Sequence, residues 1–275
     1  MSYEFETIQC TLVDNVLDIV LNRPESRNAI SKFMDQELFA ALDRAEKDPE
    51  VRAVMITGAG PMFSAGGDLK ERSGDNPVFQ EQEMFPLASP SVAPALARPW
   101  FFRKPLIAGV HKYVGPYALA WISHCDWVIA AEGTKFSCEV SRPTAPMLPW
   151  LPLYQLLPVR VIKKLFLLGG WMDAEEAHQF QLVQRVVPES EVRAETLRWA
   201  KQAALIPTES FGHSKETIHR TYEVMGLALA PTVLKRWGPP HEDMAAEFDR
   251  SVEELGLREA VRRRDAQFAD DISKV

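Results

Sequence analysis

The fold of this chain is constrained most by an alternation of short apolar runs with helical patterns, which after Ser190 gives way to helical patterns alone. The runs Val51–Thr57, Leu106–Val110 and Trp127–Ala131 have the length and composition of buried strands. Helical spacing of apolar residues is clearest after Ser31, a suitable helix cap, and involves Met34, Leu38, Leu42 and Ala45. Strand–helix alternation followed by helices predicts an α/β core with a C-terminal helical extension.

The remaining segments complete this outline. Alternating residues from Thr7 to Leu21 predict two strands, which are joined at Asp14-Asn15, a pair that tolerates positive φ in a turn. Helices are expected from about Leu151 to Leu168 and at Ala174 to Phe180. The stretch from Ser73 to Pro99 is rich in Pro, Ser and polar residues, and we expect it to form a mobile lid.

Composition narrows the classes of function. The chain has 275 residues and a net charge of -7, which argues against the basic face of a nucleic-acid-binding protein, although a few local Lys and Arg residues can still bind phosphate. No apolar run reaches the roughly 18 residues of a membrane span, and the acidic start lacks a signal-peptide pattern. Three scattered cysteines do not form a disulfide framework. We therefore expect a cytoplasmic protein with a small-molecule ligand and no membrane or nucleic-acid partner.

The run Phe63-Ser64-Ala65-Gly66-Gly67-Asp68-Leu69-Lys70 is the first that indicates chemistry. It follows a predicted strand and precedes a predicted helix, and its small residues let a ligand come close to the backbone. N–H groups in the first turn of a helix have no partner inside the helix and lie at the positive end of its dipole, so they suit a developing oxyanion. Taken alone, the run is explained more simply by an ordinary Gly-rich bend between a strand and a helix.

Several further motifs, which follow one another in a fixed order, favour the oxyanion site over an ordinary bend. Two pairs of runs resemble the N-terminal and oxyanion-loop signatures of the crotonase (enoyl-CoA hydratase/isomerase) family: Leu21 to Glu25 with Arg27 to Ile30, and Val54 to Gly58 with Phe63 to Glu71. Later segments resemble the next core strands and the exit segment of that family: Lys104 to Val110, Cys125-Asp126 with Ala131-Glu132, and Leu182-Val183 with Val186 to Pro188. The resemblance extends roughly from Phe5 to Pro188.

The resemblance implies an α/β fold of the ClpP/crotonase type, a spiral of ββα turns with a C-terminal helical segment for trimerisation. It also implies coenzyme A as the thioester part of the substrate, no tightly bound cofactor, and a homotrimer or a dimer of trimers. Residues 1–200 are then expected to form the core with the acyl-CoA site, and residues 201–275 the oligomerisation region. In the family, two backbone N–H groups bind the thioester oxygen, and Gly67 supplies the first of them here.

The second N–H donor and the acid/base groups depart from the family pattern. A gap-free count places Tyr117 at the oxyanion position that a glycine usually holds, and Pro116 before it has no N–H. Hydratases of the family use two glutamates, and the first position is Ala120 here. The second falls on Val140 in a gap-free count and on Glu139 if one residue is deleted, and we favour Glu139 because the following segment is also shortened. A single carboxylate can still move a proton between two carbons of an enoyl thioester. A solvated turn residue is an equally good explanation of Glu139.

Other residues receive their roles from the resemblance alone. Expected contacts to coenzyme A involve Arg27, Ala29, Ala65, Asp68, Leu69 and Lys70, with Arg23 as a further phosphate partner. Helix capping is the simpler role for Asp68. Arg263 and Arg264 with Phe268 resemble the tail element that contacts adenine in the family, and a solvated basic face explains these arginines at least as well. The apolar, Pro-rich run Ala145 to Pro152 is expected to reshape the acyl pocket.

The sequence thus predicts an acyl-CoA enzyme that stabilises a thioester enolate, with hydration or isomerisation of an enoyl group as the leading reactions. Hydrolysis, decarboxylation or carbon–carbon cleavage is an alternative within the same family. A catalytically silent acyl-CoA-binding subunit is an alternative outside enzymology, and the residues Ala120 and Tyr117 leave it open. The histidines show no spacing typical of metal ligands.

Overall fold

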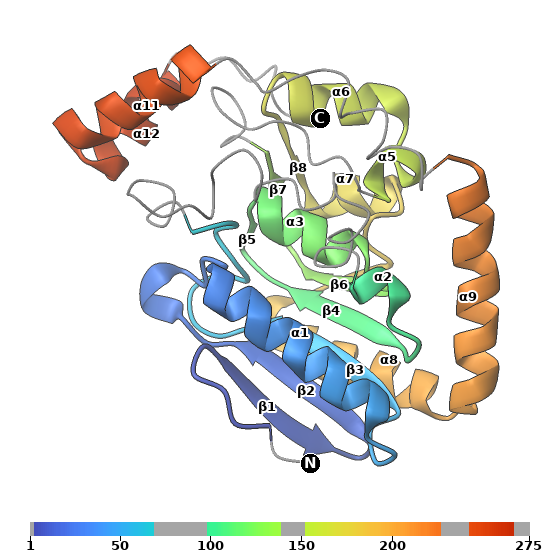
Figure 1. Ribbon diagram of the computed structural model, residues 1–275. Helices are drawn as coiled ribbons and strands as arrows, with labels where there is room; N and C mark the ends of the chain where they lie inside the picture. Colours follow the sequence, from blue (N-terminus) through green and yellow to red (C-terminus); the bar gives the residue numbers. More distant parts are fainter. Residues whose placement is uncertain (1–2, 69–97, 139–151, 227–241, 267–275) are drawn as a thin grey trace.

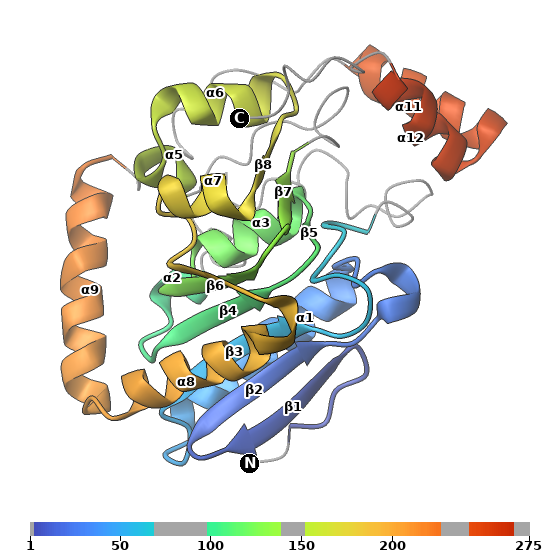
Figure 2. The ribbon, with the colours of Figure 1, turned by 180° about the vertical axis from the view of Figure 1, so that it is seen from behind.

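The computed structural model describes residues 3–68, 98–138, 152–226 and 242–266, and Figures 1 and 2 show it from opposite sides. Within these ranges no helix is long and apolar enough to cross a membrane. The helix predicted after Asp68 lies outside them. So does the predicted lid up to residue 97, but its last two residues belong to the short helix α2 (Arg98–Phe101).

A β-hairpin opens the described chain. β1 (Ile8–Val13) and β2 (Val16–Leu21) pair antiparallel, with Val13 opposite Val16. The turn residues Asp14 and Asn15 have φ values of 48° and 65°, in the left-handed region that Asp and Asn tolerate better than most residues. The predicted strand pair and its turn are confirmed.

The hairpin continues into a six-stranded sheet with the spatial order β1-β2-β3-β4-β6-β9. All neighbours after the hairpin are parallel. The strands that follow β2 are β3 (Ala53–Gly58), β4 (Leu106–Val110), β6 (Trp127–Ala131) and β9 (Arg185–Val187). They include all three predicted apolar strands, and they bring the ends of distant segments to one edge of the sheet.

Two helices cover opposite faces of this sheet, as Figures 1 and 2 show. α1 (Lys32–Lys47) begins at its predicted cap, where the Ser31 side chain accepts a hydrogen bond from the Met34 N–H at 3.1 Å. It buries its predicted apolar stripe against one face. α8 (Val192–Ala204) packs on the other face against alternate strand residues, among them Val16, Ala53, Met55, Ile107 and Ile129.

A three-stranded sheet lies beside the large one, with the order β5-β7-β8. Its strands are β5 (Tyr113–Val114), β7 (Lys135–Ser137) and β8 (Trp171–Asp173), and the helices near it are α3 (Pro116–Ser123), α5 (Leu153–Leu156), α6 (Val159–Leu167) and α7 (Ala174–Gln179). α5 and α6 are the helices predicted between Leu151 and Leu168. They are separate because Pro158 lacks an N–H and cannot continue a helix. The helix predicted at Ala174 is confirmed as α7.

The C-terminal part of the described chain is helical, as predicted. After α8 it contains α9 (Thr208–Val224), α11 (Glu242–Leu255) and α12 (Leu257–Asp265). The predicted boundary at residue 200 falls within α8, which packs on the large sheet. The division into a core and an oligomerisation region stays a prediction, as does the trimer.

His219, a residue of α9 that packs against α2, gives the stability of the fold a pH dependence. The His219 ring stacks on Trp100 with centroids 3.7 Å apart, and its Nδ1 lies 2.9 Å from the Trp100 carbonyl oxygen. Burial, aided by the positive charge of Lys215, lowers the pKa of His219 from 6.5 to about 4. Between pH 6.5 and about pH 4 the unfolded chain therefore binds a proton here that the folded chain does not. The stabilisation is complete above pH 6.5 and is lost as the pH falls toward 4.

We expect protonation of His219 to cost about 1–3 kcal/mol of the free energy of unfolding between pH 7 and pH 4. The measurement is urea unfolding at several pH values for the protein and for His219→Phe, which keeps a ring against Trp100 but does not titrate. The variant should show the shallower pH dependence. Equal slopes for the two proteins would contradict the assignment.

Candidate active site

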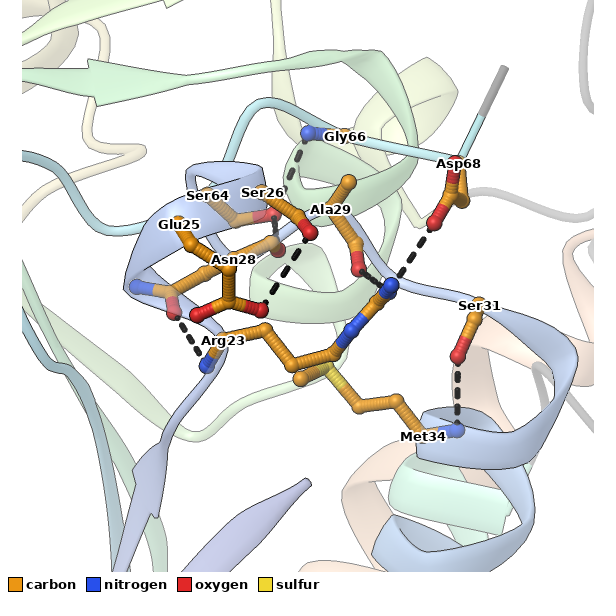
Figure 3. Close-up of polar contacts among 10 residues, drawn as sticks. All are labelled: Arg23, Glu25, Ser26, Asn28, Ala29, Ser31, Met34, Ser64, Gly66 and Asp68. Atoms are coloured by element: carbon orange, nitrogen blue, oxygen red, sulfur yellow. Dashed lines mark hydrogen bonds and ion pairs between the residues drawn. The ribbon is translucent and has the colours of Figure 1, made fainter. Parts of the chain in front are cut away.

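Asn28 joins the turn after β2 to the loop after β3. Its side chain is fully buried, its φ is 51°, and its Oδ1 accepts a hydrogen bond from the Arg23 N–H at 2.9 Å (Figure 3). Its Nδ2 lies 2.7 Å from the carbonyl oxygen of Ala59, 3.0 Å from that of Met62 and 3.1 Å from that of Phe63. Because a buried amide needs partners for its donors and its oxygen, these bonds hold the two segments in one arrangement.

Ser64 extends this connection into the predicted oxyanion loop. Its Oγ donates to the Asn28 carbonyl oxygen at 2.7 Å and accepts from the Gly66 N–H at 3.1 Å (Figure 3). Next to it, the Ala65 N–H donates to the Arg27 carbonyl oxygen at 2.9 Å. Two of the predicted coenzyme A contacts, Arg27 and Ala65, therefore lie side by side, and the Arg27 side chain is exposed.

Gly67 lies opposite Ile30 in a short parallel β-bridge. The Ile30 N–H donates to the Gly66 carbonyl oxygen at 2.8 Å, and the Asp68 N–H donates to the Ile30 carbonyl oxygen at 3.0 Å. Since successive N–H groups of an extended strand point to opposite sides, the Gly67 N–H points away from Ile30. Among the described residues it has no hydrogen-bond acceptor.

A close backbone contact brings α3 to this loop. The Ser64 N–H donates to the Tyr113 carbonyl oxygen at 3.2 Å, and the Gly115 N–H donates to the Ser64 carbonyl oxygen at 3.0 Å. A Cβ atom on Gly115 would lie 2.0 Å from the Ala65 carbonyl oxygen, so only glycine permits this approach. α3 begins at the next residue, Pro116, and its first turn therefore faces the loop.

The two predicted oxyanion residues meet at this contact. A Cβ atom on Gly67 would lie 3.7 Å from the Cβ of Tyr117. Tyr117 is in the first turn of α3, where an N–H has no acceptor inside the helix, and it has none among the other described residues. Two backbone N–H groups without acceptors thus come from neighbouring residues, an arrangement that can stabilise an oxygen as it gains negative charge.

The Tyr117 side chain points toward α1, where its Oη donates a hydrogen bond to the Asp35 carboxylate. The other oxygen of that carboxylate accepts from Nε1 of Trp121 at 2.8 Å. Burial, and then the negative charge of Asp35, raise the pKa of Tyr117 well above its ordinary value, so the phenol stays protonated. Sequence reasoning did not select Asp35, because a carboxylate in the first turn of a helix is usually solvated and no motif links it to α3.

An ion pair between Arg23 and Asp68 joins the end of the oxyanion loop to the turn after β2. Nη1 of Arg23 lies 2.9 Å from Oδ2 of Asp68 and 2.7 Å from the Ala29 carbonyl oxygen (Figure 3). The Asp68 side chain is 8% exposed, and that of Arg23 is 23% exposed. The pair therefore ties together two segments predicted to contact coenzyme A, and it engages the guanidinium that we expected to bind phosphate.

The remaining predicted residues are placed only in part. Ala120 is fully buried in α3. Arg264 forms an ion pair with Asp265 at 2.8 Å. Four predicted residues and most of one predicted segment lie outside the described residues: Leu69, Lys70, Glu139, Phe268 and the run Ala145–Leu151. Within the described ranges, no group of three or more His, Cys, Asp or Glu side chains is placed to hold a metal ion.

Replacing Asn28 by alanine is expected to lower the free energy of unfolding by about 2–3 kcal/mol, because buried carbonyl groups and the Arg23 N–H lose their partner. Urea unfolding followed by circular dichroism checks this. Asn22→Ala in the same turn is the control, since the Asn22 side chain makes no hydrogen bond to a described residue. A loss for Asn28→Ala no larger than that for Asn22→Ala would contradict the role of Asn28.

Comparison with known proteins shows which family this chain resembles along most of its length. The family model for enoyl-CoA hydratase/isomerase matches residues 12–236. EchA13 of Mycobacterium tuberculosis, whose name gives enoyl-CoA hydratase as a provisional description, is 32% identical over 82% of this chain and 78% of its own length. The mevalonyl-coenzyme A hydratase sidH of Aspergillus fumigatus is 30% identical over 83% of this chain and 85% of its own length.

A solved structure shows the same fold. The enoyl-CoA hydratase/isomerase from Xanthobacter autotrophicus Py2 superposes with a TM-score of 0.85 at 31% identity, covering 97% of this chain and all of that one. The predicted crotonase-type α/β core is therefore confirmed. From the matched family model, the relatives and the shared fold it follows that this chain belongs to the enoyl-CoA hydratase/isomerase family, the crotonase family that its motifs resemble.

Proposed function

We propose that this protein is an acyl-CoA enzyme, which binds the thioester carbonyl oxygen at the Gly67 and Tyr117 N–H groups and stabilises the enolate formed from that thioester. One observation carries the proposal: these two residues are adjacent, and neither N–H has an acceptor among the described residues. Hydrogen-bond donors that are in place before the reaction stabilise a developing charge without a cost of reorganisation. This stabilisation is the largest single contribution to catalysis in many enzymes.

The reaction we propose is hydration or isomerisation of an enoyl thioester. Family membership supports this class, since the relatives are named as hydratases. Ala120 stands where the resemblance implies the first of two glutamates, and its buried methyl group cannot take up a proton. A single carboxylate at Glu139 would then act alone, taking a proton from Cα of a 3-enoyl thioester and returning one to Cγ. Isomerisation is therefore the reaction that these residues favour.

Contacts to the coenzyme A part of the substrate follow from the same proposal. Arg27, with its exposed guanidinium, and Lys70 are the cations for phosphate groups. The adjoining backbone would line the pantetheine path, and the residues assigned to it are Ala29, Ala65, Asp68 and Leu69. No tightly bound cofactor is part of the proposal.

A panel of 2-enoyl-, 3-enoyl- and 3-oxoacyl-CoA thioesters tests this function. Turnover of 3-enoyl-CoA by the protein, with a loss of about 10²–10⁴-fold in Glu139→Gln, supports the isomerase with one acid/base carboxylate. The control is Glu132→Gln, which changes an exposed glutamate seven residues earlier in the sequence. Full activity of Glu139→Gln would contradict the acid/base assignment.

A silent binding subunit is the second candidate, and the buried Ala120 is the observation that favours it. Isothermal titration with coenzyme A and an acyl-CoA separates the two functions. Binding without turnover of any panel member would favour the silent subunit. Absence of binding would contradict both.

A further inference from the structure

Tyr117, which supplies the second oxyanion N–H, also carries an aromatic ring, and that ring must be kept away from the bound thioester. The resemblance implies a glycine there, with nothing beyond Cα. The Cβ of Tyr117 would lie 3.7 Å from a Cβ atom on Gly67. The ring of Tyr117 is therefore attached close to the two N–H groups. If the ring turned about its first side-chain torsion to lie over these N–H groups, it would occupy the space that a thioester needs. Something must hold the ring elsewhere.

Asp35 is the residue that holds it. Its carboxylate accepts hydrogen bonds from Oη of Tyr117 and from Nε1 of Trp121, which are one helical turn apart on α3. Both oxygens are thereby used on the same helix face. Asp35 also lies in the first turn of α1, where the helix dipole stabilises a negative charge.

Aromatic packing makes this arrangement rigid. The Trp121 indole is 4% exposed and stacks on Phe39, with ring centroids 5.4 Å apart and planes 17° apart. Phe39 follows Asp35 by one turn of α1, so a polar contact and a stacked contact join the same two helices in successive turns. The anchor for Tyr117 is therefore itself fixed by a buried neighbour.

We propose that Asp35 is a positioning residue for the oxyanion site: it directs the Tyr117 ring toward α1 and so keeps the Tyr117 and Gly67 N–H groups open to a thioester oxygen. This inference rests on the proposed function. In this role Asp35 acts through the Tyr117 ring and not on the substrate, and its two oxygens accept hydrogen bonds from the phenol and the indole.

A set of variants separates positioning from chemistry. Asp35→Leu should lower kcat by about tenfold or more, because the released Tyr117 ring obstructs the thioester at the two N–H groups, with little change in the affinity for coenzyme A. Asp35→Asn should recover most of that loss, because its amide can accept from the indole and donate to the phenol oxygen. The control is Asp43→Leu, which removes a carboxylate two turns further along α1 whose partner among the described residues is Arg98.

Asp35→Leu in a Tyr117→Ala background gives the decisive comparison. Without the ring, Asp35→Leu should change kcat less than twofold. An undiminished effect in that background, or an Asp35→Asn variant as slow as Asp35→Leu, would overturn the inference. Thermal unfolding of each variant identifies losses that come from stability alone.

A readout that needs no turnover distinguishes failure of this inference from failure of the proposed function. In protein labelled with 3-fluorotyrosine, the ¹⁹F resonance of Tyr117, assigned by its absence in Tyr117→Phe, should shift and broaden in Asp35→Leu but not in Asp43→Leu. An unchanged resonance would overturn the positioning role, whatever the protein does with thioesters. A changed resonance in a protein that turns over no thioester supports the positioning and contradicts only the function.

Discussion

Replacing Gly67 by proline is expected to reduce turnover of the acyl-CoA substrate by about 10²–10³-fold, which is the usual effect of losing one oxyanion donor. Proline has no N–H, and the Gly67 N–H is one of the two that have no acceptor among the described residues. The binding of coenzyme A should change much less, since the effect belongs to the transition state. Steady-state kinetics and isothermal titration measure the two quantities separately.

Gly67→Ala is the matched control for this change. A methyl group on Gly67 would meet the Tyr117 Cβ at 3.7 Å, an ordinary van der Waals distance, and alanine keeps the N–H. We expect its kcat to stay within about threefold of the unchanged protein. If both variants lost activity equally, shape and not the N–H would be responsible. Thermal unfolding shows whether the proline variant is folded.

Gly115→Ala is expected to have the largest combined effect on stability and activity. Its Cβ would lie 2.0 Å from the carbonyl oxygen and 2.4 Å from the carbonyl carbon of Ala65, so the turn before α3 must move away from the loop. The move breaks the 3.0 Å hydrogen bond from the Gly115 N–H to Ser64. We expect a loss of about 3 kcal/mol or more in the free energy of unfolding, as for severe overpacking.

The same displacement separates the two N–H donors. Movement of Tyr117 by about 1 Å relative to Gly67 is enough to lower kcat by about 10²-fold. Gly133→Ala is the control, because a Cβ atom there would meet no heavy atom within 4 Å, so the strain of alanine at a φ of 70° is its main cost, about 1 kcal/mol. Near-normal stability and kcat in Gly115→Ala would show that the loop and α3 do not need this contact.

Much of the fold could be predicted from the sequence because its signals are local. The pair Asp14-Asn15 needs only its own φ values to form the turn. Ser31 caps α1 through a bond to a residue three positions later. The apolar strand at Leu106–Val110 is buried on both faces, and its composition alone indicates this. The split between α5 and α6, which occurs at a proline, was not predicted. Neither were the short strands β5, β7 and β8 or the helix α3.

Only the site residues that belong to a family motif could be predicted from the sequence. Gly67 and Tyr117 were found through the family resemblance, and the structure brings them together. Asn28 belonged to a motif, but the residues next to it in the sequence do not predict its hydrogen bonds to three carbonyl groups of another segment. Asp35 was missed for the same reason, since its partners are on α3. Contacts between distant segments depend on the folded geometry and not on local propensity.

The central claim is that the Gly67 and Tyr117 N–H groups bind the thioester oxygen, and the stretching frequency of the thioester carbonyl tests it most directly. A 2-enoyl-CoA labelled with ¹³C at this carbonyl gives an isotope-edited infrared band for the bound molecule. Two hydrogen bonds to the oxygen should shift the band to lower frequency than in solution, and Gly67→Pro should abolish most of the shift while Gly67→Ala keeps it. A band at the solution frequency in the unchanged protein, with the thioester shown to be bound, would contradict the account.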